Sequence, residues 1–270
     1  MNGARILSAN DTTTRSAAEF LKDLLLCRLR HRQEEVGYLT SKAFYMKENA
    51  FLKQRCRSNR RTCHKASFVE GVCREADLHL AKVLRMSLRW LRPLLEDDAL
   101  DFQVIYLARD PRAVLSSRTK VPWCRSPSCR NPKVMCSLLT EDLAEVPGLL
   151  KAYPQRFKFV AYDHICRNVT GSLQDLMAFL NLPPTPDQRE FLQYPKIPHR
   201  RYGSKGNTFL LQAQLWRTST SFNHIVLPVQ HACRGSLERL GLRIFASRKE
   251  LTDLSVPGVV GGGGGSEYFT

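Results

Sequence analysis

The feature that most constrains this chain is an apolar run at 102–108, followed directly by Arg-Asp-Pro-Arg-Ala-Val-Leu-Ser-Ser-Arg at 109–118. The run has the length and the β-branched and aromatic content of an interior strand, so we expect it to be buried. Asp110 is a favourable helix N-cap and Pro111 is favourable at the first helical position, which predicts a helix immediately after the strand. A strand and a helix therefore meet at Arg109.

This corner has the features of an anion site. Unpaired N–H groups and the positive end of the helix dipole face the end of the strand, where Arg109 stands. Ser117 follows Asp110 by seven residues, two turns along the same helix face. An arginine, a helix N-terminus and a hydroxyl that converge would bind a phosphate. The same residues allow a simpler interpretation, in which the segment only starts a helix and Arg109 pairs with a surface carboxylate.

The segment closely resembles the 3′-phosphate-binding element of the carbohydrate sulfotransferases, in particular the galactose/N-acetylglucosamine/N-acetylgalactosamine 6-O-sulfotransferase family. In that family a strand ending in leucine is followed by RDPRAV and then by a Ser-Arg pair, which here is Ser117-Arg118. The resemblance implies that the donor is 3′-phosphoadenosine 5′-phosphosulfate and that Arg109 and Ser117 hold its 3′-phosphate. Trp216-Arg217 matches a WR that recurs late in the family, which makes Arg217 a third candidate donor contact.

The resemblance also implies a function. The family transfers a sulfuryl group to the 6-hydroxyl of N-acetylglucosamine, galactose or N-acetylgalactosamine in glycans or proteoglycans, without a metal, and its members are Golgi enzymes with an N-terminal membrane anchor. This chain shows no signal peptide or apolar span, so we expect anchoring only in a longer form. The family's 5′-phosphosulfate loop, Arg-Ser/Thr-Gly-Ser-Ser-Phe, does not occur in the sequence. We therefore assign no catalytic residue and expect little or no activity from this chain alone.

Strands that alternate with helices predict an α/β domain, which by resemblance is a P-loop-like sulfotransferase domain: a mainly parallel sheet flanked by helices, without its N-terminal strand and loop. Ligand is expected at the carboxyl ends of the strands. We expect a disordered N-terminus at 1–16, the partial sulfotransferase domain at 17–246 and a disordered, Gly-rich tail at 247–270. Further expectations are a helix at 17–30, a basic loop at 51–65, a helix at 134–150 interrupted at Pro147, and a strand at 157–162.

The charge balance allows a second class of function. The chain has 41 Lys and Arg against 25 Asp and Glu, a net charge of +16, which attracts polyanions. The alternative to an enzyme is therefore a non-catalytic basic protein that binds a glycan or another polyanion. A nucleic-acid partner is not expected, because the basic residues are not interleaved with aromatic ones. The sequence does not give the oligomeric state.

The chain contains nine cysteines, an odd number, with no C-x-x-C pair. Disulfides in an oxidising compartment, with one thiol left over, account for this pattern better than a metal site does, so no metal is expected. A metal site from Cys56, Cys63, His64 and Cys73 is the weaker alternative. By family resemblance, Cys136 and Cys166 are candidates for one disulfide. Asn10 and Asn168 open N-x-Thr sequons and are candidate glycosylation sites.

Overall fold

The computed structural model describes residues 11–41, 46, 49–58, 61–84, 86–122, 124, 126–193 and 208–260. The chain divides after Asp101 into two compact units, 1–101 and 102–270. Each unit has its own buried core. None of the helices in the described ranges is long and apolar enough to cross a membrane.

The first unit is helical. Its elements are α1 (Asp11–Leu25), α2 (Gln33–Ser41), α4 (Ala50–Ser58), α5 (Ala66–Arg74), the short helix η1 (Leu88–Trp90) and α6 (Arg92–Leu95). One part of its core packs Phe20 and Leu24 of α1 against buried Val36 of α2 and Ala66 of α5. Phe20 and Leu24 thus lie on the core-facing surface of α1.

Two predictions for this unit are wrong. Residues 11–16 are not a disordered segment, because α1 already begins at Asp11; it ends before Cys27, whose positive φ of 49° breaks the helix rather than allowing it to reach residue 30. The basic stretch is not a loop, because α4 carries Arg55 and Arg57 in its last turn. Leu52 and Cys56 lie on the opposite, buried side of α4, and this apolar contact outweighs the charge repulsion along the helix.

The second unit contains the sheet and the remaining helices. Its elements are β1 (Val104–Ala108), α7 (Pro111–Arg118), α8 (Pro127–Arg130), α9 (Pro132–Ala152), β2 (Phe157–Ala161), α10 (Tyr162–Arg167), α11 (Val169–Phe179), α12 (Pro186–Gln193), α13 (Thr208–Gln214), α14 (Trp216–Ser219), η2 (Phe222–Val226), α15 (Leu227–Ala232), α16 (Arg234–Arg239) and α17 (Arg248–Thr252). The long α9 is continuous through Pro147, so the expected interruption is wrong. Buried Val146 and Leu149 anchor the helix on both sides of the proline.

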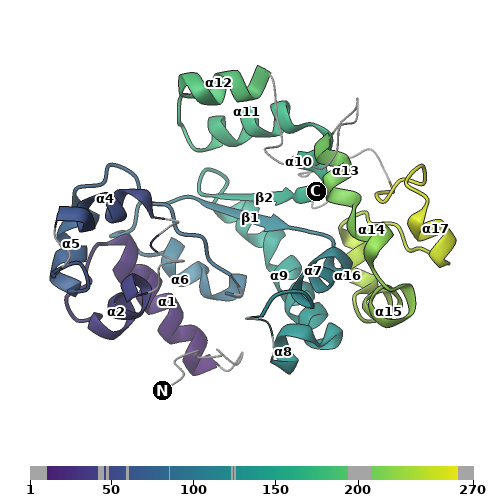
Figure 1. Cartoon of the computed structure of the whole chain (residues 1–270), viewed down its shortest axis with the longest axis horizontal. Helices are drawn as coiled ribbons and strands as arrows, with labels where there is room; N and C mark the ends of the chain where they lie inside the picture. The colour runs from purple at the N-terminus through teal and green to yellow at the C-terminus, as the bar shows by residue number, and fades with distance from the viewer. Residues whose placement is uncertain are drawn as a thin grey trace. The chain divides into compact units, whose positions relative to one another are not determined.

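The sheet of the described chain consists of β1 and β2, which run parallel and side by side (Figure 1). Val104 pairs with Phe157 and Ala108 with Ala161, so both strands end at the same edge. The α9 helix connects them and packs against β2. A parallel strand pair with a crossover helix confirms the α/β class.

The strand at 104–108 is not buried on both faces as expected. Tyr106 is half-buried and stacks on Phe159 with 6.0 Å between the ring centroids. Ile105 and Leu107, which point to the other face, are 39% and 54% exposed. The apolar run thus predicted the strand correctly but not its burial, because burial depends on which segments pack on each face of the sheet.

The tail is ordered well beyond residue 246. Ser247 caps α17 by accepting a hydrogen bond from the Glu250 N–H, and Leu242 forms an isolated antiparallel bridge with Val259. Leu251 is fully buried in a core with Trp216 and Phe245. The predicted disorder is therefore wrong for 247–260, and residues 261–270, including the glycine run, lie outside the described residues.

The cysteines form four disulfides, Cys27–Cys73, Cys56–Cys63, Cys124–Cys129 and Cys136–Cys233. Disulfides with one remaining thiol are therefore confirmed, but the predicted Cys136–Cys166 pair is wrong. Helices α9 and α15 pack together and bring Cys136 and Cys233 to a Cα–Cα distance of 4.9 Å. Cys166, near the end of α10, is buried and belongs to none of these disulfides.

Candidate functional site

The candidate site lies where β1 and β2 end. Because the strands are parallel and in register, the segments that follow them meet at one edge of the sheet. After β1 come Arg109, Asp110 and the start of α7, and after β2 comes α10 with Asp163 and His164. The predicted corner therefore exists, and the parallel pairing adds charged groups from a second segment to it.

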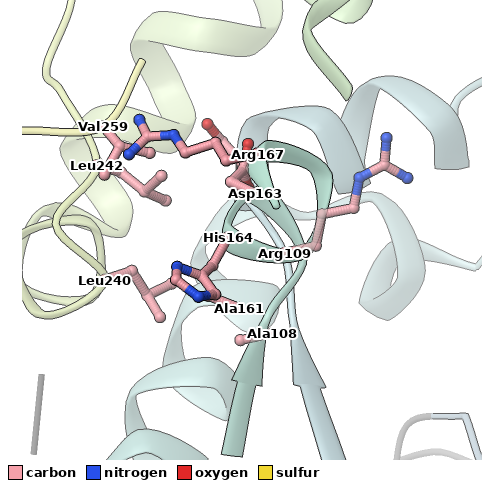
Figure 2. A pocket seen from close by; sticks show the side chains of 10 residues that line it. Ala108, Arg109, Ala161, Asp163, His164, Arg167, Leu240, Leu242 and Val259 are labelled. Carbon is pink, nitrogen blue, oxygen red and sulfur yellow. The ribbon is translucent and has the colours of Figure 1, made fainter. Parts of the chain in front are cut away.

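A small pocket opens at this edge (Figure 2). Its lining residues come from the two strand ends, α10 and the C-terminal segments: Ala108, Arg109, Asp110, Ala161, Asp163, His164, Arg167, Leu240, Leu242 and Val259. His164 is half-buried and lines this pocket. A second hollow shares Asp110, Asp163 and Arg167 with the first and reaches Arg217.

Arg109 stands at the strand–helix corner, as predicted. Its guanidinium lies over the Tyr162 ring, 4.6 Å from the ring centroid. In Figure 2 the side chain extends away from Asp163 and Arg167. Its Nε is buried without a hydrogen-bond partner in the described part of the protein. A buried, unsatisfied N–H of a cation is costly, and such a group is common where a ligand completes the site.

Ser117 lies in the last turn of α7 and its side chain is exposed. It lines neither of the two hollows described here. The structure thus confirms the predicted helix that carries Ser117. A phosphate held jointly by Ser117 and Arg109 stays a prediction.

Two acidic residues, Asp110 and Asp163, line the pocket, and the second has an unusual pKa. Burial and the nearby charge of Asp110 raise its pKa to about 6, against the opposing influence of Arg109 and Arg167. The carboxyl therefore changes its protonation state close to neutral pH. This pKa shift cannot be predicted from the sequence, because it requires α10 to be folded against the end of β1.

The Asp110 N-cap is part of a larger network. As predicted, its carboxylate accepts a hydrogen bond from the Arg112 N–H at 2.9 Å. The Arg112 side chain is fully buried and donates to Asp110 from Nε and Nη2 at 3.0 and 2.8 Å. Its Nη1 donates to Gln230 Oε1 and to the Arg243 carbonyl. Arg112 therefore ties the strand–helix corner to the C-terminal segment.

Arg217 is 1% exposed and is surrounded by backbone oxygens. Its Nε donates to the Leu251 carbonyl at 2.8 Å, Nη1 to the Val256 carbonyl at 2.9 Å and Nη2 to the Asp253 carbonyl at 2.7 Å. These bonds satisfy carbonyls at and beyond the end of α17. The observed role of Arg217 is thus to hold this segment, and its contact with a donor stays a prediction. Trp216 beside it is buried in the core, as expected.

The structure describes one of the two candidate glycosylation sites, Asn168. Asn168 is exposed and forms the N-cap of α11, where its side-chain oxygen accepts a hydrogen bond from the Gly171 N–H. Asn10 lies outside the described residues. An exposed asparagine is compatible with glycosylation, which remains a prediction at both positions.

Comparison with known proteins finds relatives of one kind. The chain is 28% identical over 204 residues to mouse carbohydrate sulfotransferase 5, a match that covers 66% of this chain and 51% of the relative. It is also 28% identical to the human carbohydrate sulfotransferases 1 and 6, over 205 and 224 residues, covering 68% and 72% of this chain and 49% and 56% of those proteins. The chain spans about half the length of these relatives. No family model matches it, and no solved structure matches it. The similarity to several carbohydrate sulfotransferases, together with the strand–RDP–helix corner, relates this chain to the carbohydrate sulfotransferases.

Proposed function

We propose that this chain binds 3′-phosphoadenosine 5′-phosphosulfate and belongs to an enzyme that sulfates the 6-hydroxyl of N-acetylglucosamine, galactose or N-acetylgalactosamine residues in glycans. Within a P-loop-like sulfotransferase domain, Arg109 and Ser117 would hold the 3′-phosphate of the donor. Arg217 stays a candidate donor contact by resemblance alone. The acceptor is a glycan or proteoglycan, and the chemistry needs no metal.

One observation carries the proposal: the buried, unpartnered Nε of Arg109 at the end of β1. A phosphate oxygen would satisfy this N–H with a charge-assisted hydrogen bond, worth more than one between neutral groups. The positive end of α7 begins two residues later and favours the same charge. Tyr162 supports the planar guanidinium from one side.

Sulfuryl transfer makes demands like those of phosphoryl transfer. The oxygen of the sugar 6-hydroxyl bonds to sulfur while the bond between sulfur and the phosphate oxygen breaks, and the hydroxyl proton passes to a base. Negative charge develops on the leaving phosphate, so catalysis depends on positioning and electrostatic stabilisation. Arg109 would contribute by anchoring the far end of the nucleotide. No residue of the chain is assigned as the base.

The test is binding of adenosine 3′,5′-bisphosphate, the product nucleotide, to the full chain. We expect the nucleotide to raise the melting temperature and Arg109→Ala to abolish the increase. Arg234→Ala is the matched control, because it removes the same charge from an exposed surface pair with Glu238. An equal shift in the two variants would refute the donor site. Ser117→Ala should weaken binding, whereas Ser137→Ala, at another exposed serine that contacts Glu141, should not.

A second candidate function is glycan or polyanion binding without catalysis. The net charge of +16 favours it, as do the arginines of α4. Binding by charge alone would fall steeply with salt and would not depend on Arg109 more than on Arg234. The nucleotide experiment, repeated with heparin at two salt concentrations, therefore separates the two candidates.

We place the protein in the lumen of the Golgi, by resemblance to the family. The four disulfides agree with an oxidising compartment. Expression through the secretory pathway should attach glycans that an endoglycosidase removes, with Asn168→Gln and Asn10→Gln each abolishing one of them. A secreted chain of unmodified mass would contradict glycosylation at both positions.

A further inference from the structure

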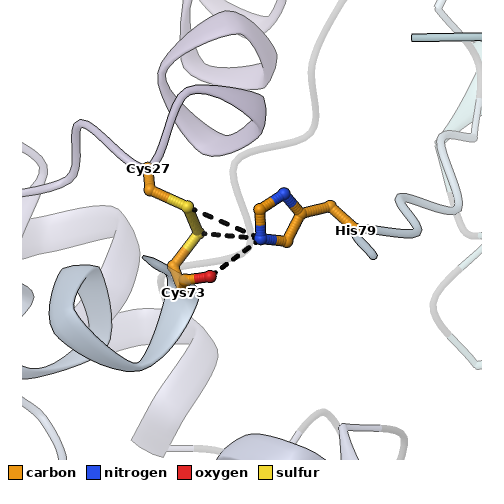
Figure 3. A group of neighbouring side chains, drawn as sticks. All are labelled: Cys27, Cys73 and His79. Atoms are coloured by element: carbon orange, nitrogen blue, oxygen red, sulfur yellow. Dashed lines mark hydrogen bonds between the residues drawn. A yellow bond between two sulfur atoms is a disulfide. The ribbon is translucent and has the colours of Figure 1, made fainter. Parts of the chain in front are cut away.

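The first unit brings together two cysteines and a histidine, residue types that can ligate a metal, which the sulfotransferase chemistry does not use (Figure 3). Cys27 follows the end of α1, Cys73 lies in the last turn of α5, and His79 follows six residues after Cys73. The two cysteines form a disulfide, and the His79 ring points at it. The His79 Nε2 atom lies 3.6 Å from Cys27 Sγ and 3.7 Å from Cys73 Sγ.

These two distances match a known geometry. In a tetrahedral zinc site with bonds of about 2.3 Å to sulfur and about 2.05 Å to nitrogen, a ligand nitrogen lies about 3.6 Å from each ligand sulfur. His79 Nε2 is therefore already placed, relative to both sulfurs, as a third ligand would be. Only the two sulfurs have to separate, to about 3.8 Å, for all three ligands to surround one ion.

The surroundings allow that movement. Cys27 is buried, whereas Cys73 is half-buried and His79 is exposed. Reduction releases the Cys73 side chain, which can rotate on the open side, while Cys27 stays fixed by the core. The exposed side of the group leaves the fourth position to water. In the oxidised protein Nε2 donates a hydrogen bond to the Cys73 carbonyl at 2.8 Å, which keeps the ring in place.

We propose that reduction of the Cys27–Cys73 disulfide converts this group into a Zn²⁺ site with Cys27, Cys73 and His79 as ligands. In the reduction a dithiol transfers two electrons and two protons: the Cys27–Cys73 bond breaks, two thiols form, and the dithiol becomes its own disulfide. Zn²⁺ then displaces the two thiol protons to solvent. The ring proton of neutral His79 moves from Nε2 to Nδ1 by exchange with water, which frees the Nε2 lone pair for the metal. The disulfide and the metal complex are alternative cross-links between α1 and α5.

The proposal differs from the metal site that the sequence allowed, Cys56 with Cys63, His64 and Cys73. In the structure Cys56 is bonded to Cys63, and His64 contacts the Thr40 hydroxyl instead of a sulfur. Among the described residues, the side chains that lie close enough together to ligate one metal ion are those of Cys27, Cys73 and His79. Its assignment is independent of the proposed sulfotransferase function, because no donor or acceptor contact enters the argument.

The experiment titrates Co²⁺, a spectroscopic substitute for Zn²⁺, into the full chain that carries Cys56→Ser and Cys63→Ser. A phosphine reductant is used, because it does not compete for the metal. We expect the reduced protein to bind one equivalent with the visible and charge-transfer bands of a tetrahedral thiolate complex, and Zn²⁺ to displace it. The oxidised protein should show no such bands. His79→Gln should abolish the complex, and His64→Gln, the matched control, should retain it.

A second measurement shows whether the reduced chain stays folded and which cysteines bind the metal. Circular dichroism follows the helices, and alkylation with mass spectrometry maps which thiols Zn²⁺ protects. We expect protection of Cys27 and Cys73 and its loss in His79→Gln. The proposal is overturned if His79→Gln binds Co²⁺ with the same spectrum, if protection falls on other cysteines, or if the reduced, folded chain binds no metal.

Discussion

Arg112 and Asp110 form a buried ion pair, with 2.8 Å between Nη2 and Oδ2 and no exposed surface on the arginine side chain. The pair stands directly behind the strand–helix corner that carries Arg109. Asp110 caps α7, and Arg112 extends from this cap to Gln230 and to the Arg243 carbonyl. The geometry of the candidate phosphate site therefore depends on a cation that does not bind the phosphate.

Arg112→Met should destabilise the second unit strongly. The substitution keeps most of the side-chain volume but leaves the Asp110 carboxylate buried without its partner, which costs about 3–5 kcal/mol. Arg234→Met is the control, because its exposed pair with Glu238 contributes at most about 1 kcal/mol. Urea unfolding followed by tryptophan fluorescence measures both. Similar losses for the two variants would contradict the assigned role of Arg112.

Arg217→Lys separates a structural role from a donor contact. A lysine cannot reach the Leu251, Asp253 and Val256 carbonyls together, so we expect faster amide hydrogen exchange and proteolysis at 248–260. Buried carbonyls that lose their donors cost about 1–3 kcal/mol each. If the variant instead keeps this segment protected and loses only affinity for adenosine 3′,5′-bisphosphate, then Arg217 acts on the donor.

Cys136→Ser and Cys233→Ser should each lower the unfolding free energy by about 2–5 kcal/mol, because the disulfide spans 97 residues and restricts the unfolded chain. The double variant should lose no more than either single one. Cys166→Ser changes a buried thiol outside the disulfides and leaves all four cross-links intact. Calorimetry of the four variants, with peptide mapping under non-reducing conditions, tests the pairing. A Cys136–Cys166 peptide would contradict it.

The stability of the chain should depend on Asp163 between about pH 4 and pH 6. Its folded-state pKa of about 6 lies above the ordinary value of 3.8, so in this range the folded chain binds a proton that the unfolded chain has lost. The free energy of unfolding therefore falls as the pH rises through this window, by up to about 3 kcal/mol, and stays low above it.

Asp163→Asn should remove this dependence. The variant should be more stable than the unsubstituted protein at about pH 7.5 and differ little from it below about pH 4. Asp175→Asn is the control, because Asp175 is 65% exposed and pairs with Lys158 at the surface. Urea unfolding at a series of pH values gives both profiles. A difference between Asp163→Asn and the unsubstituted protein that does not change with pH would show that burial of Asp163 has another cost.

Local signals in the sequence were reliable at the corner. Asp110 and Pro111 start α7 where predicted, because capping and a fixed φ act within a few residues. The strand at 104–108 was identified by composition, but its half-exposed face was not, because exposure depends on segments far along the chain. The Cys136–Cys233 disulfide was missed for a similar reason. The two cysteines are 97 residues apart in the sequence, and only the packing of their helices brings them together.

The sequence alone determined the order of strand, Arg109 and capped helix, the similarity to carbohydrate sulfotransferases and the excess of positive charge. These properties depend on neighbouring residues or on a sum over the whole chain, so they can be predicted without knowing which segments pack together. Only the tertiary structure decided that Arg112 is buried with Asp110, that Arg217 holds the C-terminal segment and that the pKa of Asp163 is raised. Each of these requires segments distant in sequence to pack together and exclude water. Without water, an unpaired charge is unfavourable and a charge interacts more strongly with a nearby partner.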